Sequence, residues 1–244
     1  MQNSGKKFKI GVKDGLPIGL GYFSVSVAFG VQASLAGLPI FISVLISMTN
    51  LTSAGQLAGL QIIASCGTIL EIILTQLVIN SRYFLMSLTL SQKTDESFTL
   101  PNRLLCSVGI TDEIFAVSSN KNGNVSNKYF LGLMLLPYVG WTLGTLTGAL
   151  AGNILPSYIT SALGIALYAM FIAIIIPPST TNRGVLSVVI LSAGISCLFY
   201  YLPLLKPVSS GIATIITALI SATIIALIFP KKQKNVREEN ENVA

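Results

Sequence analysis

The stretch PIFISVLISMTNLTSAGQLAGLQIIASCGTILEIILTQLVINSRYFLMSLTL, residues 39–90, is almost unbroken in its apolar character. A helix needs about 20 apolar residues to cross the hydrocarbon core, so this stretch is too long for one crossing and awkward for three. Polar residues interrupt it between Met48 and Gly59. Unwound backbone persists in a membrane only where protein or a water-filled cavity satisfies it. We therefore predict a break and a candidate site at Met48–Gly59, followed by one long helix from Gln61 through Arg82.

Other apolar runs lie on both sides of this stretch. One precedes it at 15–37, and a run of about 16 residues follows at 104–119, either a short span or a re-entrant helix. The later runs are 129–152, 156–177, 185–202 and 208–229. These lengths predict an all-α polytopic membrane helix bundle of six full spans plus broken or re-entrant segments, with eight short spans as the alternative. The two halves are candidates for an inverted repeat, as in many transporters.

Charge is concentrated at the two ends of the chain. Of the 244 residues, 52% are hydrophobic and 10% are charged, and the net charge is +6. Residues 1–14 form a basic tail and 231–244 a charged tail, which leaves 15–230 as a single transmembrane domain. Juxtamembrane lysines favour the cytoplasmic face, so we expect both termini in the cytoplasm.

Several classes of site are missing from the sequence. The chain has no histidine, the commonest transition-metal ligand and neutral-pH general base. Cys66, Cys106 and Cys197 show no CxxC spacing, and neither a Walker A motif nor a GxSxG motif occurs. We therefore expect no metal, no cofactor, no catalytic residue and no nucleic-acid partner, and hence a protein that is not an enzyme.

Small and aromatic residues indicate how the helices pack. Gly140, Gly144, Gly148 and Gly152 recur at every fourth position, which places them on one helix face. Such a face allows close approach of a second helix, either within this chain or from another chain. The aromatic residues expected to anchor the helices at the membrane surface are Tyr22, Trp141, Tyr200 and Tyr201.

Four ionisable residues interrupt the apolar runs: Glu71, Arg82, Asp112 and Glu113. Such groups are costly in hydrocarbon unless they are paired or face a cavity. Arg82 lies about 16 Å from Glu71 along a helix, so we predict that it pairs with Asp112 or Glu113 instead. In the alternative, Arg82 reaches the membrane surface and Asp112 caps a short helix. Glu71 is a candidate for proton coupling, with a structural acid as its alternative.

The polar residues of the predicted break are candidates for a cavity lining or for hydrogen bonds between helices: Asn50, Thr52, Ser53 and Gln56. A zwitterionic solute would place its carboxylate at Arg82 or at a helix N-terminus, and an acidic side chain would balance its ammonium group. The apolar surroundings suit a solute with an apolar side chain.

The order of several motifs resembles the AzlC family, the large subunits of branched-chain amino acid exporters. These motifs, between about residues 12 and 178, are VAFGVQASLAGL, TSAGQLAGLQ, EIILTQLVINSRYFLMSL, GITDEIFAV and KYFLGLMLLPYVGWTLGTLTGALAG. The family's signatures fall on Ala54, Gly55 and Gln56, on Asn80, Arg82 and Tyr83, and on Thr111, Asp112 and Glu113. The chain departs from the family pattern at Tyr83, where many relatives carry histidine.

The resemblance implies a secondary exporter of branched-chain or other hydrophobic amino acids in the plasma membrane of a bacterium, with a small AzlD-type membrane subunit as partner. The candidate substrate-binding residues are Asn50, Thr52, Ser53, Gly55, Gln56, Asn80, Arg82, Tyr83, Asp112 and Glu113. The alternative is a membrane subunit that does not transport but anchors or assembles a partner through its glycine face.

Overall fold

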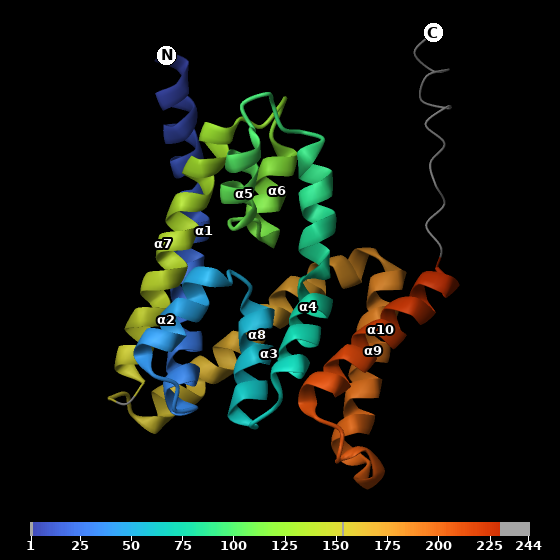
Figure 1. The fold of residues 1–244 in the computed structure, drawn as a ribbon. Coiled ribbons are helices and arrows are strands. Elements are labelled where there is room, and N and C mark those ends of the chain that lie inside the picture. The colour runs from blue at the N-terminus through green and yellow to red at the C-terminus, as the bar shows by residue number, and fades with distance from the viewer. Residues whose placement is uncertain (1, 153, 230–244) are drawn as a thin grey trace. The chain divides into compact units, whose positions relative to one another are not determined.

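The computed structural model describes residues 2–152 and 154–229 and is built of helices joined by short turns (Figure 1). In these residues the only extended pairing is an isolated bridge between Thr94 and Val125, so the all-α prediction is confirmed. The chain forms two compact units, Met1–Ile172 and Ala173–Ala244. The predicted tail 231–244 lies outside the described residues.

Six of the described helices have 19 or more residues. They are α1 (Gln2–Leu35), α4 (Ile69–Ser91), α7 (Asn127–Ala151), α8 (Ser157–Thr181), α9 (Arg183–Tyr201) and α10 (Ser210–Ile228). By length and composition, α1, α4, α7, α9 and α10 can cross a membrane. The 25 residues of α8 are also long enough, so the number of long helices agrees with the six predicted spans. In the second unit, a short 3₁₀ turn (Pro203–Leu205) joins α9 to α10.

Helix α1 begins at Gln2 and not at residue 15, where the apolar run starts. Tertiary packing explains the difference, because Gly11 and Gly15 lie directly against the backbone of α7 at Tyr129 and Leu133. Packing against α7 stabilises the helical conformation of the basic residues that precede residue 15.

Residues 39–90 are broken twice. The predicted first break is confirmed but short: α2 (Ile40–Thr49) and α3 (Ser53–Ala64) are separated by Asn50–Thr52 alone. The predicted long helix from Gln61 through Arg82 is wrong, because α3 ends at Ala64 and α4 begins at Ile69. Cys66 in the second break has a φ of 56°, in the left-handed region. Thr68 then caps α4 by accepting a hydrogen bond from the Glu71 N–H at 3.2 Å.

The apolar run 104–119 also proves to be broken. It contains the second half of α5 (Leu100–Ser107) and most of α6 (Asp112–Asn120), and both helices are too short to cross a membrane. The single short span is therefore wrong. The Asp95 N–H donates to the Val125 carbonyl at 3.0 Å, and the Val125 N–H donates to the Lys93 carbonyl at 2.8 Å. Because the chain enters and leaves this helical pair at one place, the pair is a re-entrant hairpin.

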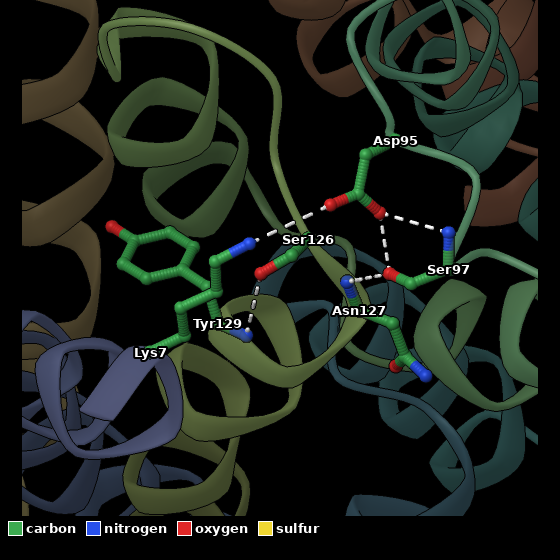
Figure 2. Close-up of polar contacts among 6 residues, drawn as sticks. All are labelled: Lys7, Asp95, Ser97, Ser126, Asn127 and Tyr129. Atoms are coloured by element: carbon green, nitrogen blue, oxygen red, sulfur yellow. Dashed lines mark hydrogen bonds and ion pairs between the residues drawn. The ribbon is translucent and has the colours of Figure 1, made fainter. Parts of the chain in front are cut away.

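The entrance of this hairpin joins the ends of three long helices (Figure 2). Asp95, just after α4, lies 3.9 Å from the ammonium group of Lys7 on α1 and accepts hydrogen bonds from Ser97. The hydroxyl of Ser97 in turn accepts a hydrogen bond at 2.9 Å from the backbone N–H of Asn127, the first residue of α7. The end of α4 therefore meets the beginnings of α1 and α7, so α4 is antiparallel to both of these helices.

Helices α1 and α7 run parallel and in close contact along their glycines. A Cβ atom at Gly140, Gly144 or Gly148 would collide with a backbone carbonyl of α1. Successive glycines of α7 meet successive turns of α1, which confirms the predicted glycine packing and assigns it to contact within the chain. The alternative contact with another chain is wrong for this face.

In the first unit, a long helix followed by a short helical hairpin occurs twice: α1 precedes the α2–α3 hairpin, and α4 precedes the α5–α6 hairpin. The α2–α3 hairpin starts at the end of α1, where the Leu38 N–H donates to the Ala33 carbonyl at 2.9 Å. The α5–α6 hairpin starts in the same way at the end of α4, which is antiparallel to α1. The two hairpins therefore enter the unit from opposite ends (Figure 1), which relates α1–α3 to α4–α6 by an inverted arrangement within the first unit. The predicted repeat between the two halves of the chain is a different relation and stays a prediction.

Candidate functional site

Each hairpin has a tip where its two helices are joined, at residues 50–52 in the α2–α3 hairpin and at residues 108–111 in the α5–α6 hairpin. The two tips meet at a cavity of about 230 Å³. Its walls come from both tips and from the middle of α4: residues 49–52, residues 107, 108 and 110, and Asn80 and Tyr83. Asn80 is the central residue of α4. The first tip also meets the middle of α7, because the Tyr138 hydroxyl donates to the Met48 carbonyl at 3.0 Å. The cavity therefore lies halfway along the helices that can cross a membrane.

Gln76 links the first hairpin to α4 through both ends of its amide group. Its Nε2 donates to the Gly55 carbonyl at 2.7 Å, and its Oε1 accepts from Nδ2 of Asn80 at 2.9 Å and from Nδ2 of Asn50 at 3.4 Å. A carbonyl oxygen only accepts, so Gly55 sets the orientation of Gln76, which in turn sets that of the two asparagines. Within the described residues, Oδ1 of Asn80 is then buried without a hydrogen-bond partner.

Gln56 holds the first tip against α7. Its side chain is 2% exposed, and its Nε2 donates to the Asn50 carbonyl at 2.7 Å and to the Ser47 hydroxyl at 3.1 Å. The indole Nε1 of Trp141 donates to Gln56 Oε1 at 3.2 Å. Both ends of this buried amide are thus satisfied, which stabilises the unwound backbone at Asn50.

The second hairpin is joined to α4 by an ion pair. Arg82 Nη2 lies 2.9 Å from Asp112 Oδ2, which confirms the predicted pairing. The alternative role of Asp112 as a helix cap is wrong, because the hydroxyl of Thr111 caps α6 by accepting from the Ile114 N–H at 3.4 Å. Arg82 Nη2 also donates to the Tyr83 hydroxyl at 3.1 Å, so the ion pair borders the cavity.

Glu113 faces a different helix from its neighbour Asp112. The Tyr22 hydroxyl of α1 donates to Glu113, and the Tyr22 ring meets the Trp141 ring edge-on, with centroids 5.2 Å apart. The two adjacent acids therefore contact α4 and α1 separately. This arrangement does not form a paired-acid site of the kind used in acid–base catalysis.

The structure brings most of the predicted site residues together. Asn50, Thr52, Asn80 and Tyr83 line the cavity, and five others lie behind its walls: Gly55, Gln56, Arg82, Asp112 and Glu113. Ser53 lies in the first turn of α3 and does not line the cavity. Glu71 lies apart from this group, buried in the first turn of α4 and about 14 Å along the helix from Asn80.

Three residues of the network are absent from the predicted set: Gln76, Trp141 and Tyr22. The last two were expected at the membrane surface, but Trp141 is 3% exposed and Tyr22 bonds to Glu113. For Gln76 the sequence does carry a signal, because Gln76 and Asn80 are four residues apart in an apolar run and so share a helix face. Tyr200 and Tyr201 are exposed, and their place at the membrane surface stays a prediction.

A family model described as AzlC protein matches residues 17–155, which include both hairpins and the cavity. The chain belongs to the AzlC family. An uncharacterized membrane protein of Archaeoglobus fulgidus is 32% identical over 172 residues, 70% of this chain and 75% of that protein. Inner membrane protein YgaZ of Escherichia coli is 28% identical over 176 residues, 69% of this chain and 72% of that protein. No solved structure matches the chain.

An uncharacterized membrane protein of Helicobacter pylori is similar at 22% identity over 183 residues, 73% of this chain and 78% of that protein. Together with the long apolar helices, these relatives make this AzlC family member a multi-pass membrane protein. The resemblance seen in the motifs is thus confirmed, and its matched region contains the full set of residues that form the cavity.

Proposed function

We propose that this AzlC family member is a secondary transporter that exports branched-chain or other hydrophobic amino acids. One observation carries the proposal: two helical hairpins enter from opposite ends and meet at a polar cavity halfway along the spanning helices. Transporters commonly build their substrate sites near the membrane midplane from discontinuous helices, and they alternate access by moving one repeat against the other. Such a role requires no catalytic residue.

The sizes and linings of two adjoining cavities support this class of substrate. The polar cavity of about 230 Å³ is below the range of about 300–1,000 Å³ typical of sites for drug-sized ligands, so it suits a small solute. A second cavity of about 290 Å³ shares Ser107 and Ile110 with it and is lined largely by apolar side chains that include Leu90, Phe98 and Phe130, with Arg103 and hydroxyl side chains also in its wall. A polar head group and an aliphatic side chain would therefore find separate surroundings.

The carboxylate of the substrate is assigned to the Tyr83 side of the cavity. The Tyr83 hydroxyl accepts a hydrogen bond from Arg82, so its own proton remains for a second acceptor. Arg82 contributes positive charge behind this hydroxyl, and Asp112 balances that charge when the cavity holds no substrate. This assignment keeps the expected role of Arg82 but places Tyr83 between it and the solute.

The distribution of charge supports a cytoplasmic location of the N-terminus in the plasma membrane of a bacterium. At the end of the first unit where α1 begins lie Lys7, Lys93 and Lys121, whereas the turns at the other end, 36–39 and 65–68, contain no charged residue. Basic residues favour the cytoplasmic side. Six crossings return the C-terminus to that same side.

A small AzlD-type membrane subunit is the proposed partner. Helix α4 offers it an apolar surface, because Leu70, Leu77 and Leu85 are each more than half exposed. The alternative function, a subunit that anchors a partner through its glycine face, loses its main support. That face is occupied by α1.

Counterflow tests the proposed function. The purified chain, with and without the small subunit, is reconstituted into vesicles loaded with unlabelled leucine, and uptake of labelled leucine is followed. Transport predicts exchange above that of protein-free vesicles, whereas an anchoring subunit predicts none under either condition. Absence of exchange with the small subunit present and the protein folded would contradict the proposal.

A further inference from the structure

We propose that the cavity between the hairpin tips is an ammonium site, in which Oδ1 of Asn80 accepts a hydrogen bond from the amino group of the solute. The inference rests on the proposed function and names the group that this part of the cavity binds. It also replaces the earlier expectation that an acidic side chain balances the ammonium group, since Asp112 and Glu113 already bond to Arg82 and Tyr22.

The first argument is the unpaired oxygen of Asn80. A buried acceptor without a partner is unfavourable, and most buried polar atoms in proteins have one. Rotation of the Asn80 amide would place its oxygen against Oε1 of Gln76, and rotation of Gln76 would place that oxygen against the Gly55 carbonyl. Both alternatives bring two acceptors together. The network therefore holds an acceptor free beside the cavity.

The second argument is the electrostatic character of the cavity walls. The last residue of α2, Thr49, and the last residue of α5, Ser107, both line the cavity. Helix C-termini carry partial negative charge and favour cations. None of the cavity-lining residues in the described part of the chain is charged, so the ends of α2 and α5 and the Asn80 oxygen favour a cation beside them, whereas the start of α3 after Thr52 and Arg82 behind Tyr83 offer positive charge to the carboxylate. A small cation that can donate hydrogen bonds matches these walls.

A primary ammonium group meets both requirements, because it carries one positive charge and has three donors. An alkali ion would satisfy the charge but has no proton to donate. Tyr83 lies three residues from Asn80 on the same face of α4, so the carboxylate and ammonium groups of one amino acid can contact adjacent positions. The proposal therefore predicts that the amine alone is sufficient for binding.

Trp141 provides a direct readout, because it is the single tryptophan of the chain. Its indole bonds to Gln56, and Gln56 bonds to the Asn50 carbonyl at the tip that lines the cavity. The purified full chain in lipid nanodiscs is titrated with isoamylammonium chloride, 4-methylpentanoate, leucine or sodium chloride at constant ionic strength. We expect leucine and isoamylammonium, which both carry the amine, to change the Trp141 emission. The carboxylate alone and sodium should not change it.

Two substitutions of Asn80 examine the acceptor itself. Asn80→Ala should weaken isoamylammonium binding by about ten- to hundredfold, because it removes a hydrogen bond to a charged group. Asn80→Asp replaces the Nδ2 donor to Gln76 with a second oxygen, but it keeps the acceptor and adds a negative charge that attracts the ammonium group, so it should bind isoamylammonium at least as tightly as the unaltered protein. The matched control is Asn120→Asp at the exposed end of α6, which should leave the affinity unchanged. If Asn80→Ala does not fold, Asn80→Asp decides the question.

The outcomes separate this inference from the proposed function. If leucine exchanges in vesicles but isoamylammonium has no effect, or binds equally well to Asn80→Ala, the ammonium site is wrong while transport stands. If isoamylammonium binds through Asn80 but leucine does not exchange, the site stands and the export proposal fails. A response to sodium equal to that of isoamylammonium would overturn the inference in favour of an alkali-ion site.

Discussion

At the scale of single residues, amide side chains hold the first hairpin in place, and one of them satisfies the unwound backbone at Asn50. Gln56 accepts from Trp141 and donates to the Asn50 carbonyl, and Gln76 donates to the Gly55 carbonyl. An amide can donate and accept at once without carrying charge. In hydrocarbon this avoids the desolvation cost of an ion while still satisfying unwound backbone.

The ion pair between Arg82 and Asp112 is the point at which single substitutions should abolish export. Arg82→Gln or Asp112→Asn removes one charge and leaves the other unbalanced near the cavity, so we expect leucine counterflow to fall to the background level. The double variant should restore the amount of folded protein in the membrane without restoring counterflow, because the arginine behind Tyr83 is still missing.

The matched control for this prediction is Arg183→Gln, because Arg183 at the start of α9 is exposed, lies outside both cavities and forms no ion pair in the described residues. Immunoblots of membranes report the amount of protein, and counterflow reports its activity. Normal exchange by both single variants would show that the charged pair is not needed for transport. Loss of folded protein in both, with full recovery of exchange in the double variant, would assign the pair a purely structural role.

At the scale of secondary structure, helix length separates the elements that cross a membrane from those that end inside it. Helices α2, α3, α5 and α6 have 8–12 residues. Helices α2 and α5 end, and α3 and α6 begin, at the breaks Asn50–Thr52 and Val108–Thr111, and α3 ends at the turn Ser65–Thr68 before α4. Threonine caps each of the three helices that begin after these breaks. The capping hydroxyl satisfies a free N–H at a helix start that lacks an intrahelical partner.

The parallel contact between α1 and α7 makes opposite predictions for two glycines. Gly144→Ala places a methyl group against the Phe23 carbonyl and the Ser26 hydroxyl of α1, so it should lower the free energy of unfolding by about 1–3 kcal/mol. Gly21→Ala lies on an open face with no atom within 4 Å of the added carbon. It should raise the free energy of unfolding by up to about 1 kcal/mol through helix propensity.

Denaturant unfolding in detergent, followed by circular dichroism, measures both changes. Because both substitutions add the same methyl group to a helical glycine, Gly21→Ala serves as the control for Gly144→Ala. Equal effects in the two variants would contradict close packing of α1 on α7. A destabilised Gly144→Ala beside an unchanged or stabilised Gly21→Ala would support it.

At the scale of the whole molecule, the first unit has one basic end and one end whose turns are uncharged. At the basic end, Lys7 of α1 pairs with Asp95 after α4, and this segment bonds to the start of α7 (Figure 2). The uncharged end contains the turn at Cys66. Because anionic lipid and the positive-inside bias both act on the basic end, we expect this end to lie on the cytoplasmic side of the bilayer. The proposed cavity would then face opposite sides of the membrane in turn.

Cysteine labelling tests this orientation. A membrane-impermeant maleimide should label Cys66, which is exposed, from outside intact cells in a background where Cys106 and Cys197 are replaced by serine. A cysteine introduced by Asn124→Cys, at an exposed position on the basic end, in a chain whose native cysteines are replaced, should react only after the cells are permeabilised. The reverse pattern would place the basic end outside and contradict the proposed topology.

Part of this structure follows directly from local sequence. Runs of apolar residues predict the long helices, because a membrane requires a minimum length of apolar helix. The four-residue glycine spacing predicts close packing for the same local reason, since one helix face repeats about every four residues. The pairing of Arg82 with the acids near residue 112 follows from the cost of an unpaired charge in hydrocarbon. None of these inferences needs the position of a distant element.

Other features depend on contacts between segments far apart in the chain, and only the tertiary structure decides them. The partner of the glycine face is α1, and the oxygen of Asn80 is unpaired because Gly55, on another helix, orients Gln76. The break at Ser65–Thr68 and the burial of Trp141 are likewise set by what packs around them. The sequence by itself thus determined a helical membrane protein and most of the residues of its candidate site. The fold decided that two hairpin tips meet around those residues, because long-range packing is not encoded in local periodicity.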